Sequence, residues 1–390
     1  MEKLQLGYVK GNDIMTKICV MTTVHQAYDG RIYHKQCKSL KKAGYEVTLL
    51  APKPDKQIND DEINLIPIEK PKKEWKRFLN TFTVFKQAKQ INADLYHFHD
   101  PELLPVGVLL RLFTKKPVIF DVHEHYPNAI MSKKYLKNWL KNPVRIAYEV
   151  IEKISLPILS GIIYTTEEVG ERYRKYTSCK IENYPLPEMF PPTSRVNKKD
   201  AYLLYLGGIT AIRGIEELIE GFSHVSKHKP EAKLLFVGSF ESTSFEENIY
   251  EKISMLGIKD KVEFKGKVPY QEIEKYLSEA TIGIIPYLPV PNHLVCLPNK
   301  LFEYMAAGVA VIASDFPHYR KVVESSNSGL LVNPERPQSI SKAMLTLLEN
   351  ESLAKEMGKN GEVAFSNTYN WGSEEEKLFS FYEKLLKKSR

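Results

Sequence analysis

Short apolar runs alternate along the chain with longer segments in which apolar residues recur every three or four positions. The short runs are rich in Val, Ile, Leu and Tyr, and most are apolar throughout, as strands of parallel sheets are when helices cover both faces. They predict an α/β protein with two parallel sheets. The predicted strands lie at residues 17–23, 46–51, 63–68, 94–99, 117–122, 161–165, 201–207, 233–238, 262–266, 281–287, 309–314 and 329–332.

Helical periodicity fills the intervals between these strands. The clearest predicted helices are 32–43, 215–227, 270–280 and 301–307. A last segment, 373–387, places Leu378, Phe381, Tyr382 and Leu385 on one helical face, which must therefore pack against something.

A chain of 390 residues is too long for one ordinary core and predicts two domains. The break lies within 181–200, where four prolines and a polar run indicate a linker. We expect doubly wound, Rossmann-like domains at 1–185 and 186–370, and a C-terminal helix within 371–390 that packs back on the first. Such domains bind ligands at the carboxyl ends of their strands.

Composition indicates the cellular compartment and the charge of the expected partner. Four scattered cysteines favour a reducing compartment over a disulfide framework, and no apolar run is long enough to span a bilayer. We therefore expect a cytoplasmic protein with peripheral membrane contact at most. Residues 1–190 hold 30 Lys and Arg against 22 Asp and Glu, whereas the rest holds 25 against 26. The basic first half points to an anionic partner.

Two basic and aromatic segments carry much of that charge. The segment from Lys133 to Arg145, which contains Trp139, is our candidate for contact with an anionic membrane; a solvated surface over core aromatics is the alternative. For residues 70–89 we favour aromatics in the core, including Phe78, Phe82 and Phe85. The sequence contains no nucleic-acid-binding motif, so we expect no nucleic-acid partner.

A glycine turn follows the first strand of the second half. The sequence GGITAIRG, from Gly207 and Gly208 to Arg213 and Gly214, leads into a helix. Glycines there let backbone amides approach a phosphate, and an arginine can hold a diphosphate with two hydrogen bonds. The spacing matches neither a dinucleotide fingerprint nor a P-loop. A tight turn with a surface arginine is the alternative.

The sequence LPNKLFEYMAAG predicts a helix that starts after Pro298 and ends at Gly308. Lys300 and Glu303 are three positions apart and share a face near its start. A lysine there could neutralise a diphosphate, and the glutamate could accept the hydroxyls of a ribose. The alternative is an exposed ion pair, but the apolar neighbours favour a buried helix.

The first half contributes polar residues after three strands. His97 and His99 share a face of one strand, and His99 is expected to face the cleft. His123 and Glu124 follow the next strand. They indicate a metal site only weakly, because the sequence offers no further ligand there. A loop with Asp29, Gly30 and Arg31 follows the first strand. These are candidate acceptor or cleft residues, with structural roles as the alternative.

Four motifs in order resemble the retaining glycosyltransferases of family 4, which have the GT-B fold. They are DGRIYHKQCKSLKKAGYEVTLL, ADLYHFHDPE, YLGGITAIRGIEELIEGF and NKLFEYMAAGVAVIASD. The resemblance implies two Rossmann-like domains facing an interdomain cleft, a nucleotide-sugar cosubstrate, and no metal or other cofactor. The Pro-Asn-Lys sequence suggests a particular branch of the family.

The resemblance also assigns roles. Glu303 corresponds to the ribose-binding glutamate, Arg213 to a diphosphate-binding residue, and His99 to a histidine at the donor sugar. The donor-binding set it implies is Gly207, Gly208, Arg213, Val268, Asn299, Lys300, Leu301 and Glu303. Two positions depart from the family pattern: Val295 replaces a glutamate that grips the sugar, and Gly208 replaces a second arginine, for which Lys300 could substitute.

The expected activity is transfer of a hexosyl or N-acetylhexosaminyl group, with UDP as the favoured nucleotide. Arg213 and Lys300 would stabilise the leaving diphosphate, and the anomeric configuration would be retained. The expected acceptor is a glycan or a lipid-linked precursor of a cell-surface polysaccharide. A nucleotide-sugar 2-epimerase on the same fold and a non-catalytic nucleotide-sugar-binding relative are the alternatives.

Overall fold

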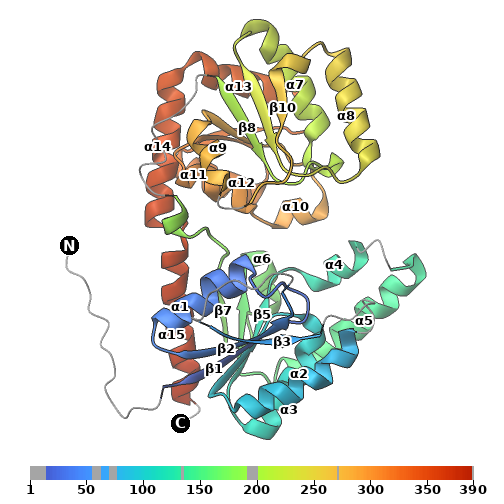
Figure 1. Ribbon diagram of the computed structural model, residues 1–390, viewed down its shortest axis with the longest axis vertical. Coiled ribbons are helices and arrows are strands. Elements are labelled where there is room, and N and C mark those ends of the chain that lie inside the picture. Colours follow the sequence, from blue (N-terminus) through green and yellow to red (C-terminus); the bar gives the residue numbers. More distant parts are fainter. Residues whose placement is uncertain are drawn as a thin grey trace, which may run out of the picture. The chain divides into compact units, whose positions relative to one another are not determined.

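The computed structural model describes residues 15–54, 63–69, 77–132, 136–190, 201–269 and 272–388 (Figure 1). It divides into two compact units. The first comprises residues 1–181 and 375–390, and the second comprises 182–374. Residues 191–200 of the predicted linker, and 133–135 of the basic segment, lie outside the described residues.

The first unit is built on a parallel sheet of seven strands in the order β3-β2-β1-β4-β5-β6-β7. The first six strands in chain order confirm predicted strands. Their apolar runs are largely buried except at β3, on the edge of the sheet, where only Ile68 is buried. The strands are β1 (Lys17–Met21), β2 (Glu46–Pro52), β3 (Asn64–Ile68), β4 (Leu95–Phe98), β5 (Val118–Val122), β6 (Gly161–Tyr164) and β7 (Ser178–Lys180).

Helices cover this sheet. The segment after β1 is a π-helix (Gly30–Cys37) that continues into α1 (Lys38–Lys42), and Asp29 caps it by accepting from the N–H groups of Arg31 and Ile32. The other helices are α2 (Arg77–Ile91), α3 (Leu104–Thr114), α4 (Tyr126–Ser132), α5 (Asn138–Ser155), α6 (Glu167–Gly170) and α15 (Trp371–Lys388). In Figure 1, α2, α3 and α5 lie along one side of this unit.

Helix α15 completes the first unit. A Cβ added at Gly161 on β6 would lie 2.8 Å from side-chain atoms of both Phe381 and Leu385, which shows how closely this helix packs on the sheet. Leu378, Phe381, Tyr382 and Leu385 are all buried, as their helical spacing predicts.

The second unit is built on a parallel sheet of six strands in the order β10-β9-β8-β11-β12-β13. The strands are β8 (Tyr202–Leu206), β9 (Lys233–Val237), β10 (Val262–Phe264), β11 (Ile282–Ile285), β12 (Ala310–Ser314) and β13 (Gly329–Val332). All six confirm predicted strands. The order β9-β8-β11 places the turn after β8 at the point where successive strands change from one side of the sheet to the other, which is where such sheets bind ligands.

Helices surround this sheet as well. They are α7 (Ile215–His228), α8 (Thr243–Met255), α9 (Ile273–Glu279), α10 (Pro291–Val295), α11 (Asn299–Ala306), α12 (Pro317–Ser326), α13 (Pro337–Glu349) and α14 (Glu351–Asn367). Within the described residues, no helix combines the length and the apolar character that crossing a membrane requires.

One expectation about the core is wrong. Phe82 on α2 is 74% exposed, whereas its neighbours Val84 and Ala88 are buried. Phe85 is half-buried, and the side chain of Phe78 lies outside the described residues. The helix turns its smaller apolar residues to the sheet, so the aromatic at position 82 faces solvent.

Candidate functional sites in the two units

The turn after β8 brings a cation against two glycines. Arg213 donates from Nη1 to the carbonyl oxygen of Gly208 at 3.1 Å, and the hydroxyl of Tyr205 donates to the same oxygen at 2.8 Å. The guanidinium lies 5.2 Å from the centre of the Tyr287 ring, a cation–π contact. These contacts hold Arg213 beside the turn, where its side chain is partly buried.

Two glycines make this turn sterically feasible. Gly207 has φ of 127°, and a Cβ there would lie 3.0 Å from Nη1 of Arg213 and 3.9 Å from Cε of Lys300. Gly214 has φ of 67°, and a Cβ there would lie 2.0 Å from the carbonyl oxygen of Pro286. Both positions require glycine. The same distances show that the side chains of Arg213 and Lys300 both lie beside Gly207.

Lys300 joins Glu303 to this turn. Its Nζ is 3.0 Å from Oε2 of Glu303, whose side chain is only 2% exposed. The pair is therefore not the exposed ion pair that the spacing alone allowed. A buried carboxylate needs hydrogen-bond donors or a cation, and Lys300 supplies one beside the turn.

Tyr304 fixes helix α11 to the strand that carries the turn. Its hydroxyl donates to the carbonyl oxygen of Leu204 at 3.0 Å and accepts from the N–H of Leu206 at 2.9 Å. Gly283 on β11 leaves room for the ring, because a Cβ there would lie within 2.6 Å of it. The sequence analysis did not assign this role to Tyr304, although its place in an apolar helix indicated burial.

The other expected donor positions are differently exposed. Asn299 is exposed at the start of α11, and Val268 packs partly buried against the core of the second unit. The side chain of Leu301 is fully buried, so only its backbone could meet a ligand. Val295 ends α10, and nearby His293 is buried. The ring centres of His293 and Tyr287 are 4.7 Å apart, and Nδ1 of His293 lies 2.9 Å from the carbonyl oxygen of Leu288.

The first unit has a second polar cluster, centred on Asp121 of β5. Its carboxylate accepts from Arg31 at 3.1–3.3 Å and from Nε2 of Gln36 at 2.6 Å. Arg31 and Asp121 are both buried, and Arg31 also donates to the carbonyl oxygen of Ile181 at 3.0 Å. The Arg31 guanidinium, opposed by burial, holds the pKa of Asp121 well below its usual value.

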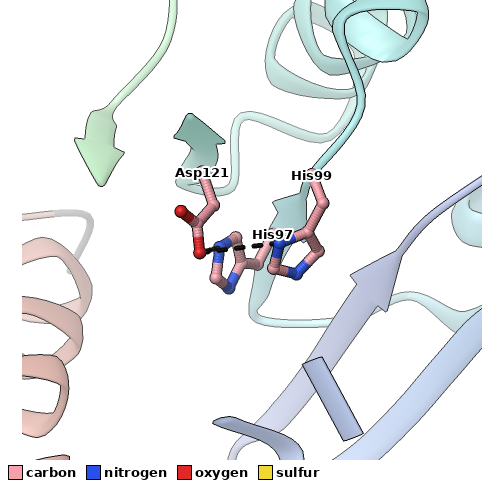
Figure 2. Close-up of side chains that lie close together, drawn as sticks. All are labelled: His97, His99 and Asp121. Carbon is pink, nitrogen blue, oxygen red and sulfur yellow. Dashed lines mark ion pairs between the residues drawn. The ribbon is translucent and has the colours of Figure 1, made fainter. Parts of the chain in front are cut away.

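Histidines surround this ion pair. Figure 2 shows His97 and His99 directed toward Asp121, with their nearest ring nitrogens 3.6 and 3.5 Å from Oδ2. The other side of His97 meets Tyr382 of α15, where Nδ1 and the hydroxyl oxygen are 2.6 Å apart. This link between β4 and the C-terminal helix had no signal in the sequence, because the two positions are 285 residues apart.

His99, which is predicted to face the cleft, is covered by its neighbours within the first unit. Its side chain has no exposed surface, and its Nδ1 is 3.0 Å from Nε2 of His123, whose side chain is 17% exposed. Its Nε2 is buried, and within the described residues it has no hydrogen-bond partner. Any influence of His99 on a ligand would therefore pass through His123.

A more open group lies beside His123. Glu124 is partly exposed, and the rings of His25 and His123 are 4.9 Å apart. His25 also lies 3.6 Å from each of Asp29 and Asp100. Gly30 is exposed at the start of the π-helix, whereas Arg31 turns inward to Asp121. Of the expected acceptor residues, Asp29, Gly30, His123 and Glu124 thus retain exposed surface and Arg31 does not.

His97, His99 and Asp121 form a group of metal-ligand type, with ligand atoms within 4.8 Å of one another. The donor set does not suit a cation. Asp121 is already paired with Arg31, one nitrogen of His97 is engaged by Tyr382, and a metal would lie close to the guanidinium. The group is better explained as a buried network around an Arg–Asp pair.

Two family models match consecutive parts of the chain. The model described as Glycosyltransferase Family 4 matches residues 17–182, and the model described as Glycosyl transferases group 1 matches residues 188–363.

Known proteins resemble the chain at low identity. The capsular polysaccharide biosynthesis glycosyltransferase CapM of Staphylococcus aureus is 21% identical over 91% of this chain and 94% of its own. The GDP-mannose:cellobiosyl-diphosphopolyprenol alpha-mannosyltransferase of Xanthomonas campestris is 20% identical over 72% and 71%. The chain spans about half the length of two uncharacterized glycosyltransferases of Methanocaldococcus jannaschii, matching 46% of each.

Solved structures share the whole architecture. A sucrose-phosphate synthase from Thermosynechococcus elongatus has a TM-score of 0.74 at 20% identity, with 96% of this chain and 100% of that chain covered. HepE of Anabaena, solved in complex with UDP, has a TM-score of 0.73 at 13% identity, with 95% and 100% covered. The fold is therefore GT-B, and with both family models matched, the chain belongs to glycosyltransferase family 4, the glycosyl transferases of group 1.

Proposed function

We propose that the protein transfers a sugar, with retention of configuration, from a nucleotide diphosphate sugar to a glycan or lipid-linked acceptor. The observation that carries this proposal is that Arg213 and Lys300 both lie beside Gly207, and that Lys300 pairs with the buried carboxylate of Glu303. Two fixed cations at one glycine turn suit a diphosphate, and a buried carboxylate suits the two hydroxyls of a ribose.

The two cations would stabilise the leaving group. When the bond between sugar and diphosphate breaks, negative charge grows on the phosphate oxygens, and preorganised cations lower the barrier without reorganising at that moment. Arg213 and Lys300 would thus do what a divalent cation does in other transferases, so we propose that no metal is needed. An oxygen of the donor phosphate would take the proton of the attacking hydroxyl.

In the first unit, we propose that His123 meets the sugar or the acceptor and that His99 positions it. The ring of His123 is partly exposed, and His99, 3.0 Å away, is fixed beside the Arg31–Asp121 pair. Asp29 and Glu124 are then the candidate groups for acceptor hydroxyls. This assigns the more direct role to the histidine that solvent reaches.

The relatives name more than one donor. HepE was solved with UDP, whereas the Xanthomonas protein is named for GDP-mannose and a cellobiosyl-diphosphopolyprenol, and the Staphylococcus protein for capsular polysaccharide biosynthesis. We propose a UDP-sugar donor, as in HepE, a hexosyl or N-acetylhexosaminyl group, and a role in cell-surface polysaccharide biosynthesis.

The test uses radiolabelled UDP-, GDP- and ADP-sugars, with and without a membrane extract as the source of acceptor. We expect label to enter an extractable glycan or lipid only with the extract, also in the presence of a chelator. Arg213→Ala and Glu303→Gln should each lower the transfer rate at least 100-fold, whereas Arg320→Ala, an exposed control on α12, should leave it unchanged. Undiminished transfer by both site variants would overturn the assignment.

The same experiment separates the alternatives. A 2-epimerase would release an altered sugar or free UDP without any extract. A non-catalytic relative would bind a nucleotide sugar in a thermal-shift assay and turn none over.

A further inference from the structure

Helix α5 is apolar on the face turned to solvent and polar on the face turned inward. Its exposed residues include a stripe at helical spacing, residues 139, 143, 147, 150 and 154, and all five are apolar. Trp139 is 71% exposed and Ile154 65%. Its buried residues are Tyr148, Glu152 and Ser155. A surface helix of a soluble protein normally has the opposite arrangement.

The inward polar residues fix this orientation. Glu152 accepts hydrogen bonds from the hydroxyls of Tyr148 at 2.6 Å and Tyr173 at 2.8 Å, and it pairs with Arg172. Rotating α5 to bury its apolar stripe would move Glu152 away from Tyr173 and Arg172 and would expose the buried Tyr148 to water. The apolar face is therefore held outward by the core of the unit.

The neighbouring helix extends the same surface. On α3, Leu109, Leu112 and Phe113 are exposed by 40%, 59% and 64%. Helices α3 and α5 are in contact, and Figure 1 shows both on one side of the first unit. Nine of the eighteen large apolar side chains exposed among the described residues lie on these two helices, so the apolar surface is concentrated and not scattered.

Basic residues accompany this surface. Residues 104–116 and 137–155 contain seven Lys and Arg and two acidic residues. Glu152 is one of the two and is buried. Arg145 is paired with Glu149 at 3.0 Å and Lys116 with Asp94 at 3.0 Å, and the other five basic residues remain. The solvent-facing charge is therefore cationic. A second copy of the chain would bring the same cationic charge and be repelled, whereas an anionic lipid surface offers both an apolar interior and a negative rim.

We propose that the exposed faces of α3 and α5 dock the protein on an anionic lipid membrane. The apolar stripe enters the boundary between headgroups and acyl chains, and the basic residues meet the lipid phosphates. The surface extends beyond the segment that the sequence indicated, from Trp139 along α5 to Ile154 and across to α3. It does not depend on the donor site, which lies in the other unit.

The full-length protein is tested by co-sedimentation with vesicles of phosphatidylcholine alone or with 30% phosphatidylglycerol. We expect binding at least tenfold tighter to the anionic vesicles and weaker binding as salt rises. The variant Ile146→Glu/Ile154→Glu should weaken it at least tenfold. The control Met255→Glu/Val363→Glu makes the same charge change at exposed positions of the second unit and should bind within twofold of wild type.

Three results would overturn the proposal. The protein could fail to bind anionic vesicles, or the Ile146/Ile154 variant could bind as tightly as the control. Sedimentation equilibrium could also reveal a dimer that only this variant abolishes, in which case the face meets a second copy. All four altered positions are exposed, and matched thermal unfolding of the two double variants shows that a loss of binding is not a loss of fold.

Discussion

Two histidines beside Asp121, His99 and His123, make the folded protein less stable as the pH falls. Burial lowers the pKa of His123 to about 4 and that of His99 well below 6.5. Below pH 6.5 the unfolded chain takes up protons at these positions and the folded chain does not, so stability falls as the pH drops. His25 acts oppositely: burial lowers its pKa, but Asp29 and Asp100 raise it overall. Its contribution is complete below 6.5 and is lost as the pH rises through the raised value.

We predict that the urea midpoint for unfolding of the first unit decreases as the pH is lowered from 6.5 to 4. In His123→Gln, the loss of unfolding free energy over this pH range should be smaller by on the order of 2–3 kcal/mol, because a glutamine does not titrate. Urea unfolding at several pH values, followed by hydrogen exchange in β5, measures it. His228→Gln, at an exposed histidine of the second unit, is the control, and an unchanged slope in His123→Gln would contradict the prediction.

Tyr304 is predicted to stabilise the second unit through its hydroxyl. Tyr304→Phe leaves the N–H of Leu206 and the carbonyl of Leu204 without this partner in a buried place, which costs about 1–3 kcal/mol. Tyr250→Phe, which removes a hydroxyl from a half-exposed ring, should change stability by no more than about 0.5 kcal/mol. Urea unfolding compares the two, and equal effects would show that the hydroxyl of Tyr304 is not engaged.

At this scale, the sequence identified residues whose neighbours are local and missed those that depend on distant partners. Arg213, Lys300 and Glu303 belong to motifs in which spacing already places them on a turn or on one helix face. Gln36 and Tyr382 reach the histidine cluster from separate elements, and no periodicity reveals such a meeting. The burial of His99 could not be predicted either, because a strand position gives the face of a side chain and not what covers it.

At the scale of elements, the sequence predicted the strands well. Twelve apolar runs became β1 to β6 and β8 to β13. The central strands are apolar because they are buried on both faces, whereas the edge strands β3, β10 and β13 are partly exposed. Strand β7 (Ser178–Lys180) was missed because it is only 3 residues long and largely polar. The π-helix at Gly30–Cys37 was expected only as part of an α-helix, because its apolar spacing differs little from the α-helical one.

The part of α15 from residue 375 onward is predicted to stabilise the first unit alone. Phe381→Ala removes a buried ring beside β6 and should cost about 3–5 kcal/mol. Hydrogen exchange should therefore accelerate in β4, β5 and β6 and stay unchanged in β8 and β11. Lys384→Ala, at an exposed position one residue from that buried face, is the control. Acceleration spread evenly over both units would contradict the prediction.

At the scale of the whole molecule, the two units should respond differently to nucleotide. If the donor site lies at the turn after β8, UDP at 100 times its dissociation constant stabilises the second unit by about 2.7 kcal/mol. Hydrogen exchange should then slow in residues 201–238 and 282–314, and far less so in Lys300→Gln. Protection confined to the first unit would place the nucleotide elsewhere and contradict the prediction.

The packing of Phe381 and Leu385 on Gly161 has a consequence for biosynthesis. On the ribosome, β1 to β7 emerge while residues 375–390 are still to be made, and domains generally fold as they appear. The face of β6 then lacks its cover until these residues emerge from the ribosome. The first sheet to be synthesised thus waits for a distant segment before it reaches its final stability. A truncation before residue 375 would therefore destabilise the unit that was made first.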